Sequence, residues 1–351
     1  MIPGCAIGIG LLIALIVYLA IISPGKSVSE KLFVPIGGVE QGMFIHSKNI
    51  QNPVLLYVHG GPAFPNYFLI EKFKPGLEDY FTVCYWEQRG GGLSYTPAVS
   101  IESMTLDQLT SDLIEVSNYL RDRFGKEQIY LLAHSGGTPI ALSAASRAPQ
   151  LFKAYIAMAQ ISRKSESERM AYQYLMKQFI EKKDHRSVKE LKKFRDIQTE
   201  EDILSFHSSL IRDKAMHQSG IGTMRQMQSI FRGVFVPVWT CRAYTLREKI
   251  KIWKSKIFFL PKTNLKKEIL STDYTQTIPS LDLPVYFISG KYDLTVNVEL
   301  SREYFDKLHA PLKGFYTFEN SAHSPIFEEP ERFRLILEKD ILNAELNLSD
   351  K

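Results

Sequence analysis

Residues 128–145 read QIYLLAHSGGTPIALSAA, and this stretch decides the fold that the sequence predicts. An apolar run of strand length, residues 129–133, stops at Ser135 and the two glycines after it, and a helical pattern of small residues begins at once. A serine on a tight turn between a strand and a helix is a nucleophile elbow, usually written G-x-S-x-G, which lifts the hydroxyl clear of the sheet. Ala133 stands where the pattern has its first glycine. The stretch therefore predicts an exposed nucleophilic serine on an α/β sheet.

An activated serine needs an acid and a histidine, which should follow it in that order along the chain. Asp293 comes just after an apolar run at 284–288, and His323 comes just after the next run at 314–319. The carboxyl ends of parallel strands meet at one edge of a sheet, where such sheets place their sites. Taken singly, the two residues would be a turn aspartate and a loop histidine. Their order, spacing and placement together predict a catalytic triad with Ser135.

A glycine pair after another buried strand predicts an oxyanion hole. Residues 53–59 (PVLLYVH) are apolar and run into Gly60-Gly61-Pro62. Glycine lets the backbone approach a reacting carbonyl closely, so the amide of Gly61 is one expected donor. The other is the amide of Gly136, the residue after the serine. We expect His59 to brace this loop rather than take part in catalysis.

Strand and helix patterns alternate along most of the 351 residues, which predicts a mostly parallel sheet flanked by helices. A hairpin of two short strands, 31–36 and 39–47, is expected at its start. The alternation stops after Gln160 and returns at Leu283, so a helical cap is expected between two parts of one α/β core. The predicted organisation is an N-terminal anchor at 1–25, a first core part at 26–162, a helical cap at 163–278 and a second core part at 279–351.

The predicted cap carries 24 Lys and Arg against 13 Asp and Glu, whereas the whole chain has a net charge of +5. Solvated helix faces rich in lysine are one explanation, and contact with an anionic lipid surface is the other. Nucleic acid is not an expected partner because no recognition motif accompanies the charge. The sequence predicts no cofactor and no metal: it has no CxxC or paired-histidine spacing and no GxxxxGK[ST] loop.

The N-terminal residues are unlike the rest. Residues 5–22 are almost wholly aliphatic, and no charged residue occurs before Lys26, which predicts an uncleaved transmembrane helix. A cleaved signal peptide is the alternative, but no basic residue precedes the run and no A-x-A site follows it. Because Lys26 and Lys31 follow the run, the positive-inside rule favours a cytoplasmic catalytic domain. The sequence thus predicts a single-pass membrane protein.

Five segments together resemble the proline iminopeptidase-like branch of the α/β-hydrolase fold. They are HGGPAFP (59–65), YWEQRGGGLSY (85–95), AHSGG (133–137), GKYD (290–293) and NSAHSP (320–325). The resemblance implies the α/β-hydrolase fold and a serine hydrolase acting on an N-terminal proline or a related small amide or ester. The sequence departs from the family pattern at Glu87, where the family has aspartate, at Ala133, and at Gly136, where a tryptophan is frequent. The last departure removes a bulky wall beside the acyl pocket and leaves room for a different substrate.

The resemblance also implies that acidic cap residues bind the free amine of a peptide substrate. Four residues are candidates: Glu166, Glu168, Glu200 and Glu201. The basic excess of the cap argues against a cation-binding site, so we expect a serine hydrolase for a small-molecule or peptide substrate without fixing its class. Two alternatives are an esterase or lipase-like enzyme for amphipathic acyl substrates and a non-catalytic ligand-binding protein of the same fold.

Overall fold

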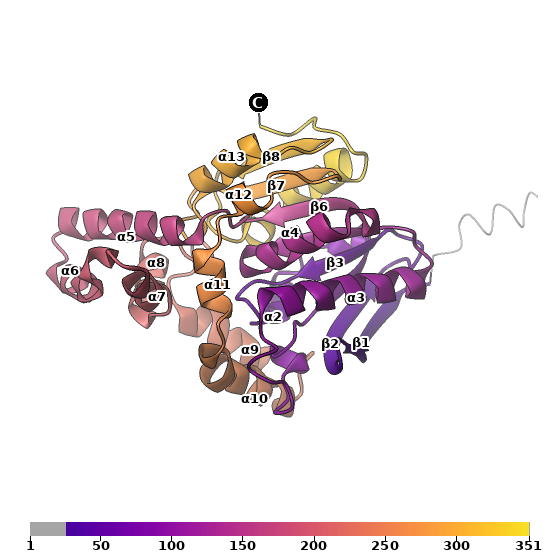
Figure 1. Ribbon diagram of the computed structural model, residues 1–351, viewed down its shortest axis with the longest axis horizontal. Coiled ribbons are helices and arrows are strands. Elements are labelled where there is room, and N and C mark those ends of the chain that lie inside the picture. The colour runs from indigo at the N-terminus through magenta and orange to yellow at the C-terminus, as the bar shows by residue number, and fades with distance from the viewer. Residues whose placement is uncertain (1–25, 351) are drawn as a thin grey trace, which may run out of the picture.

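A computed structural model describes residues 26–350 and shows an eight-stranded sheet between helices, with an arm of helices extending from one end (Figure 1). The strand order is β1-β2-β4-β3-β5-β6-β7-β8. The strands are β1 (Val28–Ile36), β2 (Val39–Ser47), β3 (Val54–Val58), β4 (Thr82–Trp86), β5 (Ile129–His134), β6 (Phe152–Met158), β7 (Val285–Gly290) and β8 (Lys313–Phe318). β1 and β2 pair antiparallel with each other, β2 pairs antiparallel with β4, and the other pairs are parallel.

The predicted hairpin at the start of the core is confirmed. Gly37 and Gly38 connect β1 to β2 with φ of 56° and 77°, a region that glycine enters without steric cost. In the middle of the sheet, β3, β4 and β5 are buried along their whole length, because helices cover both faces. Continuous apolar runs such as residues 54–58 are typical of such strands. The predicted α/β-hydrolase architecture is therefore present in the described residues.

Two hydrophobic clusters, one on each face of the sheet, form the core. Leu56 of β3 points to the face covered by α3, α4 and α13, and the next residue, Tyr57, points to the face covered by α2 and α15. This alternation follows from the two-residue period of a strand. The core helices are α2 (Tyr67–Phe73), α3 (Leu106–Phe124), α4 (Thr138–Arg147), α13 (Val298–Lys307), α14 (Pro325–Glu328) and α15 (Pro330–Ile336).

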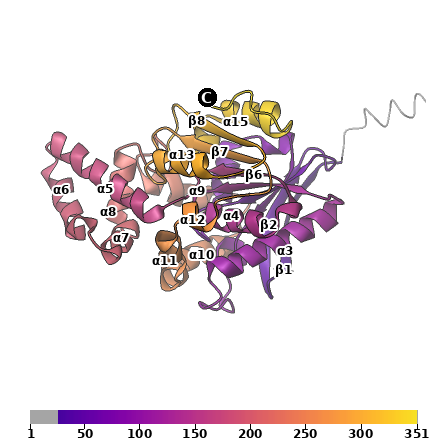
Figure 2. The same cartoon turned by 45° about the horizontal axis from the view of Figure 1, so that its top comes forward.

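The fully described segment between β6 and β7 contains eight α-helices besides shorter 3-10 and π-helical turns, and most of it forms two lobes (Figure 2). The first lobe, α5 to α8, has its own hydrophobic core, in which Tyr172 packs edge-on against Phe206. The second lobe, residues 224–262, packs on the α2 face of the sheet instead. The helices are α5 (Lys164–Glu181), α6 (His185–Leu191), α7 (Glu200–His207), α8 (Leu210–Gln218), α9 (Val236–Thr240), α10 (Leu246–Lys254), α11 (Leu265–Ser271) and α12 (Tyr274–Thr277).

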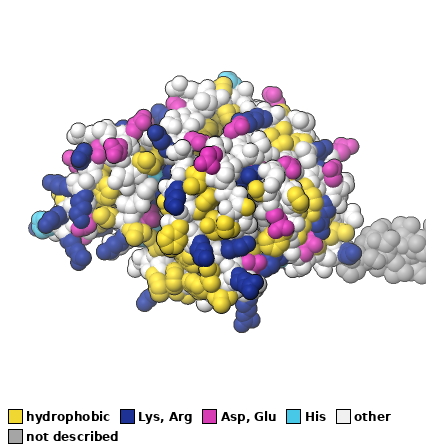
Figure 3. Space-filling model, turned by 60° about the horizontal axis from the view of Figure 1, so that its bottom comes forward, with side chains coloured by type: hydrophobic (Ala, Val, Ile, Leu, Met, Phe, Trp, Pro, Cys, Tyr) yellow, Lys and Arg dark blue, Asp and Glu magenta, His cyan; other side chains and the backbone are white. Residues whose placement is uncertain are grey.

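The second lobe exposes many large hydrophobic side chains. These are Phe231, Phe235, Val236, Leu246, Ile250, Ile257 and Phe258. In the space-filling view, hydrophobic side chains gather in the lower part of the molecule with Lys and Arg among and around them (Figure 3). Two stretches of this lobe, Phe231–Phe235 and Ser255–Phe259, are π-helical.

The predicted membrane anchor requires a correction. Within residues 26–350 no helix is long and apolar enough to cross a bilayer. The physical reason is plain in α3 and α5, which have sufficient length but carry charged side chains. The predicted single-pass membrane localisation thus has no support in the structure and is withdrawn. The anchor predicted at residues 1–25 lies outside the described residues.

Candidate active site

Ser135 lies on the turn between β5 and α4 with a left-handed backbone, φ 53°. A residue other than glycine in this conformation costs on the order of 1–3 kcal/mol, and such strain clusters at functional sites. Ala133, the departure from the elbow pattern, lies within β5 and outside the left-handed turn, so it carries none of that strain. The serine side chain is partly exposed. The strand, the tight turn and the helix of an elbow are thus present around Ser135.

Asp293 and His323 meet at the same edge of the sheet. Asp293 follows β7, His323 follows β8, and the histidine Nδ1 lies 2.8 Å from the Asp293 Oδ2. The other carboxylate oxygen of Asp293 accepts a hydrogen bond from the amide of Val296 at 2.9 Å. Because a carboxylate can only accept, Nδ1 carries the proton and Nε2 is left as the basic nitrogen.

The residue before the serine links the two parts of the site. The Nε2 of His134 donates to the backbone oxygen of His323 at 2.8 Å, and the two rings lie 4.8 Å apart. Burial, together with the neighbouring His323, lowers the pKa of His134 to about 3, so this ring is neutral. Within residues 26–350 the hydroxyl of Ser135 makes no hydrogen bond. Catalytic hydrogen bonds of this kind often form fully only when substrate binds.

The glycine loop after β3 packs directly against the elbow. A Cβ placed on Gly136 would lie 3.0 Å from the nitrogen of Gly61, and one on Gly60 would lie 2.9 Å from the Cβ of Ser135. Gly61 has φ 100°, which favours glycine at this position. The structure thus brings together the two amides predicted as oxyanion donors. A Cβ at Gly136 would be in tight contact with this loop.

His59 and Gln88 hold this loop from behind. The Nδ1 of His59 donates to the oxygen of Gly60 at 2.9 Å, and its Nε2 accepts from the amide of Gln88 at 3.2 Å. The Gln88 side chain donates to the oxygen of His59 at 2.6 Å and accepts from the amide of Ala63 at 2.8 Å. Burial lowers the pKa of His59 to about 4, so the ring stays neutral. The bracing role predicted for His59 is confirmed, whereas no sequence pattern singled out Gln88 for this task.

Glu87 ties the second cap lobe to the core. Its carboxyl group bonds the hydroxyl of Tyr244 and accepts from the amide of Leu93 at 2.5 Å. Burial raises its pKa to about 7. Arg89, two residues on, forms a buried ion pair with Asp112 of α3 at 2.7 Å. Both side chains support loops of the core around the site.

The acidic cap residues do not form an open amine site. Glu166, Glu200 and Glu201 are exposed, and Glu168 is fully buried. Glu168 contacts three basic side chains: Lys164 at 2.7 Å, Arg212 at 2.7 Å and His207 at 2.9 Å. Burial alone would raise the pKa of Glu168, but Arg212 and Lys164 hold it well below its usual range. Its charge is therefore already compensated within the protein.

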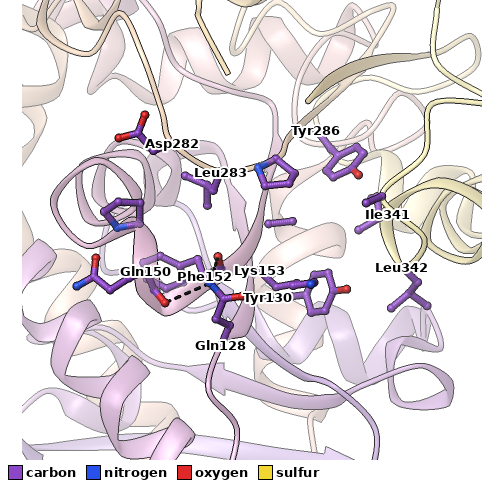
Figure 4. Close-up of a pocket in the computed structure, with 14 residues that line it drawn as sticks. Gln128, Tyr130, Gln150, Phe152, Lys153, Asp282, Leu283, Tyr286, Ile341 and Leu342 are labelled. Atoms are coloured by element: carbon purple, nitrogen blue, oxygen red, sulfur yellow. Dashed lines mark hydrogen bonds between the residues drawn. The ribbon is translucent and has the colours of Figure 1, made fainter. Parts of the chain in front are cut away.

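Two cavities lie at opposite ends of the core. One, of about 840 Å³, opens beside the His323 loop, where Asn320 and Glu328 line it together with residues of the second lobe. The other, of about 450 Å³, lies where β5, β6 and β7 begin, at the edge of the sheet away from Ser135, and Tyr130 and Tyr286 line it (Figure 4). Among residues 26–350, no group of three or more His, Cys, Asp or Glu side chains is placed to hold a metal.

Fold and site define an α/β hydrolase, and a family model described as the alpha/beta hydrolase fold matches residues 53–195. The chain is 33% identical to the probable aminopeptidase YbaC of Bacillus subtilis (strain 168), over 88% of this chain and 95% of that protein. It is 25% identical to a proline iminopeptidase of Saccharolobus solfataricus, over 92% of this chain and 96% of that protein. The protein belongs to the proline iminopeptidase-like family of α/β hydrolases.

Solved structures share the fold. The crystal structure of a proline iminopeptidase from Mycobacterium smegmatis matches with a TM-score of 0.64 at 16% identity, covering 90% of this chain and 98% of that one. A proline iminopeptidase-related protein from Thermus thermophilus matches with a TM-score of 0.59 at 20% identity, covering 89% of this chain and 96% of that one. At these identities the likeness concerns the fold alone.

Proposed function

We propose that this α/β hydrolase is a serine hydrolase that cleaves a small amide or ester through an acyl-enzyme. One observation carries the proposal: Ser135 sits on a left-handed elbow against the Gly61 loop, and the hydrogen-bonded pair of Asp293 and His323 lies at the same sheet edge. A non-catalytic binding protein has no physical need for this combination.

In the proposed mechanism, the Nε2 of His323 takes the hydroxyl proton as the Oγ of Ser135 attacks the substrate carbonyl carbon. Asp293 orients the imidazole and stabilises its cationic form. The amides of Gly61 and Gly136 donate to the oxyanion, and the loss of one such donor typically costs about 3 kcal/mol of transition-state stabilisation. His323 then protonates the leaving amine or alcohol. Water, deprotonated by the same nitrogen, hydrolyses the acyl-enzyme and restores the serine.

Two substrate classes are candidates. The names of the relatives favour an amide at an N-terminal residue, proline included. The compensated charge of Glu168 favours the second class, an ester or amide whose recognition does not depend on a free amine. A panel of proline amides and short- to medium-chain acyl esters separates the two classes by their kcat/KM values.

The first test is active-site labelling of the full chain with a fluorophosphonate, in which the Oγ of Ser135 bonds phosphorus and fluoride leaves. We expect labelling of the wild type and none of Ser135→Ala. Ser146→Ala is the matched control, because Ser146 lies exposed on α4, eleven positions after Ser135 in the chain. A folded wild type that resists labelling, or a Ser135→Ala variant that still turns over substrate, would overturn the assignment.

A further inference from the structure

The second cap lobe brings a lysine to the oxyanion loop. The Nζ of Lys256 lies 4.9 Å from the centre of the Phe64 ring. Phe64 belongs to the glycine loop itself, since a Cβ placed on Gly61 would lie 2.7 Å from the Cβ of Phe64. Lys256 is thus a cation next to the loop that carries Gly61, although it comes from a helix far away in the chain.

Contacts on both sides of Lys256 fix the position of its backbone. It lies in the π-helical stretch Ser255–Phe259, and π-helical turns occur frequently at functional sites. The hydroxyl of Ser255 is buried and donates to the backbone oxygen of Gly90 at 2.5 Å. Phe259, at the end of the stretch, packs against Tyr95 with ring centres 5.3 Å apart. These two contacts fix the stretch to the glycine-rich turn of the core on either side of Lys256.

A second lysine, Lys266, lies on α11, a helix that contacts α5 and α7 of the first lobe (Figure 1). Its Nζ lies 3.3 Å from the hydroxyl of Ser208. Burial lowers the pKa of Lys266 to about 8, with the charge of Lys256 as the next cause. Two ammonium groups that disfavour each other's charge gain stability when an anion binds between them.

Lys256 combines solvent access with close protein surroundings. Its side chain has an exposed surface, yet the protein atoms around it desolvate the ammonium group enough to lower its pKa. A side chain that water reaches between two lobes is also accessible to a small anion.

The carboxylates near these lysines form ion pairs with other basic residues. Glu168 is compensated by Lys164 and Arg212, and Asp213 lies 3.1 Å from Arg212. Within residues 26–350, neither Lys256 nor Lys266 forms an ion pair. Lys256, which lies over the ring of Phe64, and Lys266, which lies beside Ser208, are therefore positive charges that no carboxylate of the described residues pairs with.

We propose that Lys256 and Lys266 form a subsite that binds an anionic group of the substrate, a carboxylate or phosphate attached to the acyl or leaving part of the cleaved amide or ester. This inference deepens the proposed function and rests on it. It is the opposite of recognition of a free amine, because Lys256, the charge next to the glycine loop, is positive.

The test compares the rates at which two fluorophosphonate probes label the full chain, one with a neutral alkyl tail and one with a carboxylate at the end of the same tail. We expect the wild type to prefer the anionic probe by about tenfold or more, as a hydrogen bond to a charged group commonly supplies. In Lys256→Gln with Lys266→Gln the ratio of the two labelling rates should fall to about one, because the anionic probe loses its partners and the neutral probe has none to lose. Lys256→Arg with Lys266→Arg should retain it.

Lys254→Gln is the matched control, since Lys254 is exposed two positions away and should leave both rates unchanged. Equal rates for the two probes in the wild type, or equal losses for both probes in the glutamine variant, would overturn the subsite and leave the serine hydrolase standing. Absence of labelling by either probe would overturn the proposed function instead.

Discussion

Two buried carboxylates, Asp293 at the sheet edge and Glu168 in the cap, are held in different ways. Asp293 pairs with the side chain of His323 and with a backbone amide. Glu168 contacts three basic side chains, among them Lys164 and Arg212. A carboxylate paired with a histidine can respond when that ring takes a proton, whereas one surrounded by permanent cations is fixed in charge. The pair at the sheet edge is thus suited to the proposed proton transfer, whereas the cluster inside the cap stabilises the fold of the cap.

The largest effect should come from Asp293→Asn. An amide can donate to Nδ1 and hold the His323 ring in the wrong tautomer, so we expect the labelling rate of Ser135 to fall about 10⁴-fold. Thermal unfolding should change little. Asp282→Asn is the control and should keep the wild-type rate, because Asp282 is exposed and precedes β7, whereas Asp293 follows it. A fall of less than about tenfold, or 1.4 kcal/mol, would remove Asp293 from the triad.

Glu168→Gln should show the next largest effect, on stability rather than on chemistry. It leaves Lys164 buried without its counter-charge and Arg212 with only the partly exposed Asp213, and breaking such a buried pair typically costs about 3–5 kcal/mol. The measurement is the free energy of unfolding in denaturant. Glu166→Gln, exposed on the same helix, should change it by less than about 0.5 kcal/mol. Equal unfolding free energies for the two variants would contradict the structural role of Glu168.

Glu87 should make stability depend on pH. Its pKa is about 7 in the folded protein against an ordinary value of 4.5, so its stabilising contribution is complete below pH 4.5 and is lost as the pH rises through 7. The full loss is about 3 kcal/mol. The wild type should therefore lose about 3 kcal/mol of unfolding free energy between pH 5 and pH 8 that Glu87→Gln does not lose. An identical difference in both proteins would contradict a neutral, buried Glu87.

The smallest effect is expected for Gln88→Ala, which removes the brace of the glycine loop without touching the reacting groups. The loop amides should then be less well placed for the oxyanion, at a cost of about 2 kcal/mol, or roughly a 30-fold fall in kcat with KM little changed. Gln128→Ala serves as control, because Gln128 is exposed and precedes β5 at the edge of the sheet away from Ser135. A rise in KM with kcat unchanged would point to substrate binding rather than to the oxyanion.

The core could be predicted from the sequence because local patterns determine it. Short apolar runs predict the strands, apolar residues at helical spacing predict α3, and small residues around Ser135 predict the elbow. The environment of Glu168 could not be predicted, because Arg212 is 44 positions away and only the fold of the first lobe brings the two together. The same holds for Lys256, whose place depends on a contact of Ser255 with Gly90 across 165 positions. Side chains brought together by long-range packing leave no local pattern.

The strand order has a consequence for how the protein is made. Ser135 emerges from the ribosome with the first half of the chain, but His323 follows β8, which is the last strand of the sheet in sequence and lies at its edge. A nascent chain that has already folded its elbow still lacks His323 and Asp293, the proposed base and acid. If Ser135 is the nucleophile, as proposed, it becomes reactive only when synthesis is nearly complete and the final strand has joined the sheet.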